Sequence, residues 1–391
     1  MANSPRVHLK YLDGLRGWAS LFVVFHHIWQ FVAGQVDLSP LPRWFTVMTV
    51  FKYGPLAVTV FIVLSGYSLM IPIVRTVDAT FSDGLRGFIR RRALRILPAY
   101  YAAFTLSIGL ILVVPALRAP GGTPWDLALP ALSARNLVLH GALLHNVLEA
   151  FQYKGNPPLW SVALEWQIYF VFALAILPVW RRLGEYAAFG VALLIGFVPL
   201  PFGGAYAHTW YVGSFAFGMW AAAINFSVHR ARYSWTNKVP WGLVCTACLL
   251  PVAFWLVKLK GNLNDVDKWV PLVFAHLSVS LATAAFLVRS TNELIVEKKS
   301  LLVRAMSHPW STKLGSFSYS LYLLHYPLLA ALCLPLRAAH MDRVLMFATL
   351  IVVGIPVMLA ACYVFHLAFE KPFIRGRTPT PAAANAASAD S

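Results

Sequence analysis

Residues 15–33 read LRGWASLFVVFHHIWQFVA, an apolar run of membrane-crossing length that also carries an arginine and two histidines. A membrane helix needs about 20 mostly apolar residues. Arg16 and His27 are eleven residues apart, which is close to three helical turns, so both project from one face with a rise of roughly 16 Å between them. His26 points about 100° away from that face. The segment therefore predicts a membrane helix with a polar face.

The composition of the whole chain favours the same environment. Of its 391 residues, 59% are hydrophobic and 12% are charged, whereas soluble domains carry about 25% charged residues. We therefore predict an all-α polytopic integral membrane bundle of about ten transmembrane helices. The ten candidate segments are residues 15–33, 54–75, 97–116, 161–180, 186–203, 208–225, 240–258, 269–289, 315–336 and 344–367.

The basic residues predict an orientation and argue against nucleic acid as a partner. The net charge is +17, but the basic residues form short clusters between apolar runs, as in cytoplasmic loops of membrane proteins. With a cytoplasmic N-terminus, about 22 of the 32 basic residues fall inside. We expect a multi-pass protein of a bacterial inner membrane with both termini in the cytoplasm.

Residues 1–377 are expected to form one transmembrane domain, followed by a disordered, low-complexity tail at residues 378–391. The longest outer segment, residues 117–160, contains a leucine-rich stretch at 136–151 that predicts an amphipathic helix on the membrane surface. Cys245 and Cys248 form a CxxC pair with no second pair at zinc-ligand spacing, so we expect helix-packing residues and no metal site.

Ionisable groups inside membrane spans are costly and mark functional sites by default. Besides Arg16 and His27, the segment PPLWSVALEWQIYF contains Glu165, placed just inside the outer boundary, where it can orient a histidine, pair with an arginine or reach outward to water. The segment GSFSYSLYLLHYPLL contains His325. The alternative for all of them is snorkelling or hydrogen bonding between helices.

The run RRRALR at residues 90–95 follows the second apolar segment. It is sufficient as a signal for cytoplasmic location. It also suits recognition of a phosphorylated donor, because the arginine fork matches phosphate geometry.

Six segments, in order, resemble motifs of the acyltransferase 3 family of membrane acyltransferases. They are YLDGLRGWASLFVVFHH, with Arg16 and His27; VFIVLSGYSL; FIRRRALRILPAYY; NPPLWSVALEWQIYF; SFSYSLYLLHYPL; and FEKPF. Two departures are Trp166, where the family often has a second acidic residue, and Ala163, where it often has serine. We expect no esterase-like domain after the last helix, so the chain resembles stand-alone members.

The resemblance implies transfer of an acyl group, most often acetyl, from cytosolic acyl-CoA to a hydroxyl. Acceptors in the family include cell-wall and envelope glycans, exopolysaccharides, Nod-factor sugars and macrolides. We therefore expect an O-acetyltransferase that uses acetyl-CoA as donor substrate, holds no permanent cofactor or metal, and meets a carbohydrate or glycoconjugate acceptor in the lipid bilayer.

A mechanism follows from the residue chemistry. His27 is the expected general base, since histidine titrates near neutral pH, and Glu165 orients it or holds the acceptor. Arg16, Arg92 and Arg95 are expected to bind the CoA phosphates. Contacts to the acceptor are assigned to Tyr169, Tyr319 and His325, and His325 is the reserve base.

Two questions stay open at this stage. Direct transfer and an acyl-enzyme relay through Ser65, Ser318 or Ser320 are not distinguished by the sequence. The competing class of function is a transporter or flippase for a glycan or acyl donor. A transporter of the inverted-repeat kind would show matching broken helices in its two halves, and the sequence shows no such pair.

Overall fold

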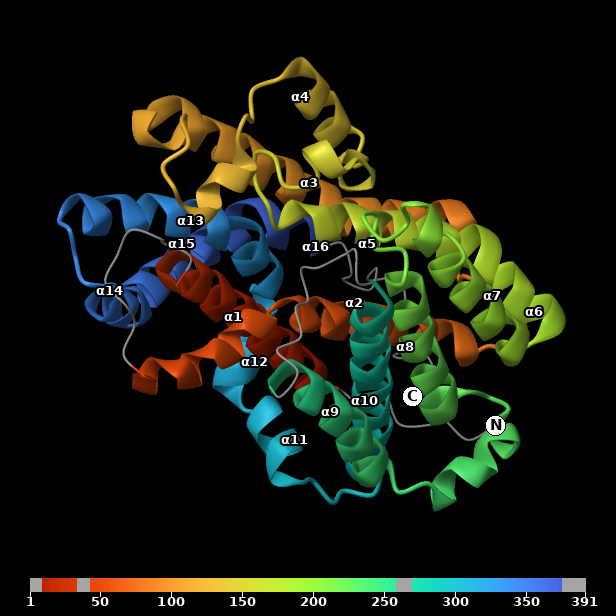
Figure 1. The fold of residues 1–391 in the computed structure, drawn as a ribbon. Coiled ribbons are helices and arrows are strands. Elements are labelled where there is room, and N and C mark those ends of the chain that lie inside the picture. The colour runs from red at the N-terminus through yellow and green to blue at the C-terminus, as the bar shows by residue number, and fades with distance from the viewer. Residues whose placement is uncertain (1–8, 34–42, 258–268, 375–391) are drawn as a thin grey trace, which may run out of the picture.

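The computed structural model describes residues 9–33, 43–257 and 269–374, and within these ranges the protein is helical, without a strand. The predicted all-α fold is therefore confirmed. The predicted tail at residues 378–391 lies outside the described residues. Figure 1 shows long helices packed around α1 (Lys10–Ala33), which lies among α2, α12 and α13.

Each of the ten predicted segments corresponds to a helix. Besides α1, these are α2 (Pro55–Val74), α3 (Gly84–Val113), α5 (Leu159–Val171) continuing into α6 (Leu177–Leu183), α7 (Glu185–Phe197), α8 (Tyr211–Phe226), α9 (Trp241–Val257), α10 (Trp269–Ile295), α13 (Ser318–Ala338) and the run of α14 (Arg343–Thr349), α15 (Ile355–Phe365) and α16 (Lys371–Ile374).

The expected count of ten membrane spans is not confirmed. Within the described ranges, seven helices are long and apolar enough to cross a membrane, or eight if α8 and the sharply bent helix after it form one span. The helix α1 is not among the seven because its arginine, histidines and glutamine lower its mean hydropathy. The helix α9 is not among them because it has only 17 residues. The protein is a helical membrane bundle.

The outer segment is not the single amphipathic helix expected at residues 136–151. It consists of α4 (Ala134–Gly141) and two short 3-10 turns, His145–Val147 and Glu149–Phe151. Figure 1 places α4 beside α3, where the Tyr101 hydroxyl donates to the Gly141 carbonyl over 2.7 Å. The histidines and asparagines of this segment are buried, whereas Leu137, Leu144 and Leu148 are exposed and Leu143 is buried. His140 and both asparagines hydrogen-bond to neighbouring groups.

Glycines allow three close approaches between helices, two of them onto α1 and one onto α2. A Cβ atom on Gly14 would lie 1.8 Å from the Met306 carbonyl oxygen in α11 (Leu301–Met306), and one on Gly17 would lie 2.7 Å from the Gly315 nitrogen in α12 (Pro309–Ser316). A Cβ on Gly218 of α8 would lie 2.0 Å from the Val63 carbonyl oxygen of α2. Small residues at helix interfaces are the usual means of close packing in membranes.

We expect Gly218→Ala to destabilise the bundle by about 1–3 kcal/mol, because the added methyl group overpacks the contact between α8 and α2. The measurement is the melting midpoint of the detergent-solubilised protein, followed by size-exclusion chromatography after heating. Gly190→Ala is the matched control, since a Cβ atom there meets nothing within 4 Å. Equal midpoints for the two variants would contradict this packing.

Candidate active site

Two imidazole rings from different helices meet at the C-terminal half of α1. The His27 ring centroid lies 5.0 Å from that of His325 on α13 and 4.7 Å from that of Tyr326, which it meets edge to face. His325 is fully buried, and His27 is half-buried. The two histidines singled out in the sequence are therefore brought together in space.

Hydrogen bonds assign the protons of these rings. The Nδ1 atom of His27 lies 2.9 Å from Gln30 Oε1, and the Nδ1 atom of His325 lies 3.0 Å from the Leu321 carbonyl oxygen. Because both oxygens accept, each Nδ1 carries the proton in the neutral ring and each Nε2 keeps its lone pair. The Nε2 atom of His325 is buried and has no hydrogen-bond partner among the described residues. The site thus presents imidazole nitrogens able to accept a proton.

His26 is turned away from this site, as the 100° step along the helix predicts. Its Nδ1 lies 2.7 Å from the Phe51 carbonyl oxygen in the 3-10 helix η1 (Arg43–Tyr53), which follows α1. Its ring also fills the space beside Gly54. His26 therefore fixes η1 against α1.

Arg16 lies at the opposite end of the polar face of α1. Its guanidinium donates to Ser68 Oγ on α2 over 2.7 Å and to Asp13 Oδ1 over 3.3 Å. It is also within electrostatic range of Glu165 and Arg95. Since α1 is an unbroken helix through both residues, the predicted spacing of roughly 16 Å between Arg16 and His27 holds.

Glu165 belongs to the Arg16 end of the site. Its Oε1 accepts a 2.5 Å hydrogen bond from the Tyr169 hydroxyl, and that hydroxyl lies 3.2 Å from Ser65 Oγ on α2. Among the described hydrogen bonds, none joins Glu165 to His27. The expectation that Glu165 orients His27 or holds the acceptor therefore stays a prediction, and the contacts described for the carboxylate lie at the Arg16 end. The alternative, pairing with an arginine, fits the proximity of Arg16.

The other two predicted phosphate ligands, Arg92 and Arg95, differ in how many of their donors already have partners. Arg92 has a buried Nε without a hydrogen-bond partner among the described residues, and its charge acts on Tyr169. Arg95 lies 3.3 Å from the buried Glu370 carboxylate and 6.0 Å from the centre of the Tyr319 ring. Glu370 therefore neutralises part of the Arg95 charge, whereas Arg92 retains an unused donor suited to an anion.

The FEKPF motif positions Arg95. Glu370 Oε2 accepts a hydrogen bond from Ser320 Oγ over 2.6 Å and lies 2.8 Å from His366 Nδ1. Sequence reasoning noted the motif without assigning a role to Glu370. Of the three serines considered as relay sites, Ser320 is bound to this carboxylate and Ser318 donates to the Gly315 carbonyl. Ser65 is buried beside Tyr169.

Tyr322 connects the two ends of the site. Its ring centroid lies 5.9 Å from that of His325, and its hydroxyl lies 2.6 Å from Ser161 Oγ on α5. Tyr322 is also within electrostatic range of Glu165. The histidines, Tyr322, Glu165 and Arg16 together are called the polar row below.

Tyr319 and Tyr169 have structural partners as well as a place in this row. The Tyr319 hydroxyl donates to the Ile96 carbonyl over 3.1 Å, which fixes α13 to α3. The sequence prediction assigned no role to Gln30 or Tyr322, although each lies three residues from a candidate histidine, on the same helix face.

The outer segment forms a separate polar cluster. The His140 ring stacks on that of His145 at 3.7 Å, and its Nδ1 lies 3.0 Å from the Tyr100 hydroxyl. Burial lowers the pKa of His140 to about 4, so these rings are neutral near pH 7. The cluster fixes α4 to α3.

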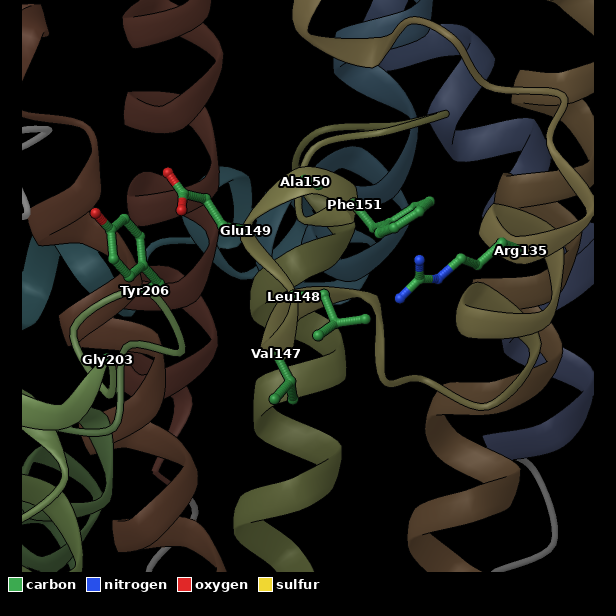
Figure 2. Close-up of a pocket in the computed structure, with 8 residues that line it drawn as sticks. All are labelled: Arg135, Val147, Leu148, Glu149, Ala150, Phe151, Gly203 and Tyr206. Carbon is green, nitrogen blue, oxygen red and sulfur yellow. The ribbon is translucent and has the colours of Figure 1, made fainter.

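A shallow surface depression lies next to this cluster. Figure 2 shows Arg135 and Phe151 facing each other, with Glu149 and Tyr206 on the other side. The Arg135 guanidinium lies 4.9 Å from the centre of the Phe151 ring. None of the residues of the Arg16–His27 row lines the depression. In the described ranges, no group of three or more His, Cys, Asp or Glu side chains is arranged to hold a metal ion.

Comparison with known proteins adds to this geometry. The family model described as "Acyltransferase domain", Acyl_transf_3, matches residues 9–367. The chain is 27% identical over 350 residues to the acyltransferase MdmB of Streptomyces mycarofaciens, which covers 82% of this chain and 79% of that protein.

A second relative is ORF330 of Acidianus two-tailed virus, whose name describes a suspected acetyltransferase. It is 23% identical over 328 residues, which covers 80% of each chain. No solved structure matches significantly. Because the family match includes nearly the whole described chain and every residue of the polar row, this membrane protein belongs to the acyltransferase 3 family.

Proposed function

We propose that this acyltransferase transfers an acyl group, in the first instance acetyl, from cytosolic acyl-CoA to a hydroxyl of a glycan or glycoconjugate. The observation that carries the proposal is that the two ends of the polar row differ in chemistry. Arginines lie at one end, where the buried Arg92 Nε has no hydrogen-bond partner among the described residues. Two imidazole rings, each with a lone pair on Nε2, lie at the other end. The first suits the phosphates of the donor, and the second suits removal of a hydroxyl proton.

In the proposed reaction, His27 acts as the general base. Its Nε2 takes the proton of the acceptor hydroxyl as the hydroxyl oxygen attacks the thioester carbonyl carbon. The tetrahedral intermediate then collapses, the carbon–sulfur bond breaks, and the departing thiolate receives the proton from His27. The ester and free CoA are the products, and atoms and charges balance without a further reactant.

Arg16, Arg92 and Arg95 bind the CoA phosphates in this proposal, and the pantetheine arm runs along α1 towards His27. With the positive-inside orientation, the arginine end faces the cytoplasm, where acyl-CoA is available. Tyr169 and Tyr319 lie at the arginine end of the row, beside Glu165 and Arg95. Direct transfer is favoured over a serine relay because Ser318 and Ser320 already donate to the Gly315 carbonyl and the Glu370 carboxylate.

A carrier that moves a glycan or an acyl donor is the competing function, since polar groups in membrane helices also serve transport. The family membership favours the enzyme. The relatives carry acyl- and acetyltransferase names, and we extend that activity class to this chain.

The deciding experiment uses membranes that contain the protein, incubated with acetyl-CoA labelled in the acetyl group. We expect label in an alkali-labile ester of the extracted glycan fraction, and none with membranes that lack the protein. Label that crosses the membrane as free donor, without any ester, would overturn the proposal in favour of a carrier. Mass spectrometry of the labelled fraction identifies the acceptor.

A further inference from the structure

We propose that Gln30 is a positioning residue that sets the tautomer of His27 and so keeps Nε2 available as the base. This inference rests on the proposed function. Gln30 Oε1 lies 2.9 Å from His27 Nδ1 on the same helix. An acceptor at Nδ1 requires the proton to be there, which leaves the lone pair on Nε2.

The helix geometry explains why this contact forms. Residues three apart on a helix are neighbours on its surface, so the Gln30 amide reaches back over the ring of His27 in the preceding turn. The ring is held on its other sides by His325 at 5.0 Å and by the edge of Tyr326 at 4.7 Å between centroids. The imidazole therefore has a fixed plane as well as a fixed proton.

The titratable neighbours of His27 do not duplicate this function. His26 uses its Nδ1 on the Phe51 carbonyl of η1, and His325 uses its Nδ1 on Leu321 of α13. The Tyr326 hydroxyl donates to the Pro124 carbonyl over 2.7 Å. The titratable groups that act electrostatically on His27 are His26 and His325, both histidines. Among the residues that the structure describes, Gln30 is thus the hydrogen-bonding partner of His27, and it is neutral.

A neutral partner has a chemical consequence. In hydrolases with a Ser-His-Asp triad, a carboxylate orients the histidine and also stabilises its protonated form. The Gln30 amide orients the ring without that charge, so proton transfer from the imidazolium to the departing thiolate is not opposed by a carboxylate. Replacing the amide with a carboxylate keeps the acceptor and adds the charge, which separates the two effects.

The test compares three variants in detergent-solubilised protein with acetyl-CoA as probe and membranes lacking the protein as the source of acceptor. Gln30→Met removes the acceptor with little change in shape. We expect it to lower kcat about tenfold, because a tenfold change corresponds to the free energy of about one hydrogen bond. The KM for acetyl-CoA should change little. Gln30→Glu is expected to restore part of kcat and to move the acid limb of the pH–rate profile to higher pH by about one unit or more.

Gln152→Met is the matched control, because Gln152 Nε2 lies 3.1 Å from His208 Nδ1 in a second glutamine–histidine pair outside the polar row. It should leave kcat and the pH profile unchanged. The inference is overturned if Gln30→Met retains full kcat, or if Gln30→Glu leaves the acid limb where it was. A fourth variant, His27→Ala, separates the two proposals. If His27→Ala stays active, His27 is not the base and the proposed function fails. If His27→Ala is inactive while Gln30→Met keeps full kcat, only the proposed role of Gln30 fails.

Discussion

His27→Ala is expected to lower kcat for acyl transfer by about a hundred- to ten-thousandfold, which is the usual contribution of a positioned general base. The KM for acetyl-CoA should change little, because the proposed donor contacts lie roughly 16 Å away at the arginine end. The measurement is steady-state release of free CoA thiol, together with ester formation in the glycan fraction. This pattern, a loss in kcat with binding retained, marks an interaction made only in the transition state.

The controls must separate lost chemistry from lost structure. His229→Ala serves as the matched substitution, since His229 is exposed and its side chain makes no capping hydrogen bond. Both variants should elute from size exclusion as the unmodified protein does. Residual activity in His27→Ala that vanishes in the double variant with His325→Ala would identify His325 as the second base. A fully active His27→Ala protein would contradict the mechanism.

The polar face of α1 was predictable because it depends only on helical geometry. Eleven residues correspond to nearly three turns in any α-helix, and α1 is an unbroken helix from Lys10 to Ala33. The pairing of His27 with His325 was not predictable. It depends on α13 lying beside α1, and the glycines that permit the close packing of α1 with its neighbours act through backbone atoms far along the chain.

The location of Glu165 shows a different limit. Hydropathy placed it near the outer boundary because α5 begins only six residues earlier. However, the Asn156 side chain just before α5 donates over 2.9 Å to the carbonyl of Leu323, in the N-terminal third of α13. The chain before α5 thus reaches deep into the bundle, and Glu165 lies nearer Arg16. A single sequence contains no signal for the depth at which a helix begins.

The outer segment shows how burial can reverse an apparent pattern. The leucines of residues 136–151 predict a helix with its apolar face against the membrane. In the structure three of these leucines, Leu137, Leu144 and Leu148, are exposed, but His140 and His145 are buried against α3. Burying the His140 ring without hydrogen-bond partners would be costly. The Tyr100 hydroxyl and the Lys154 carbonyl bind His140, and they determine which face of the segment turns inward.

Arg16→Gln is expected to raise the KM for acetyl-CoA about tenfold to a hundredfold while kcat at saturation changes less. Hydrogen bonds to charged groups are worth about 1.5–3 kcal/mol, and the variant loses such bonds to the donor phosphates. The effect should weaken as salt is added, since ions screen the arginine–phosphate attraction in the unmodified protein. Titration of acetyl-CoA at two ionic strengths measures both quantities.

Arg86→Gln is the control for a general loss of positive charge, because Arg86 is exposed near the start of α3 and lies away from the polar row. It should leave the KM unchanged. Removing Arg16 also frees Asp13 and Ser68, to which it donates at 3.3 and 2.7 Å, so glutamine is preferred to alanine as a replacement that can still bond Ser68. If Arg16→Gln instead lowers kcat and leaves the KM unchanged, Arg16 acts at the reacting carbonyl, and the donor phosphates must be bound by Arg92 and Arg95 without it.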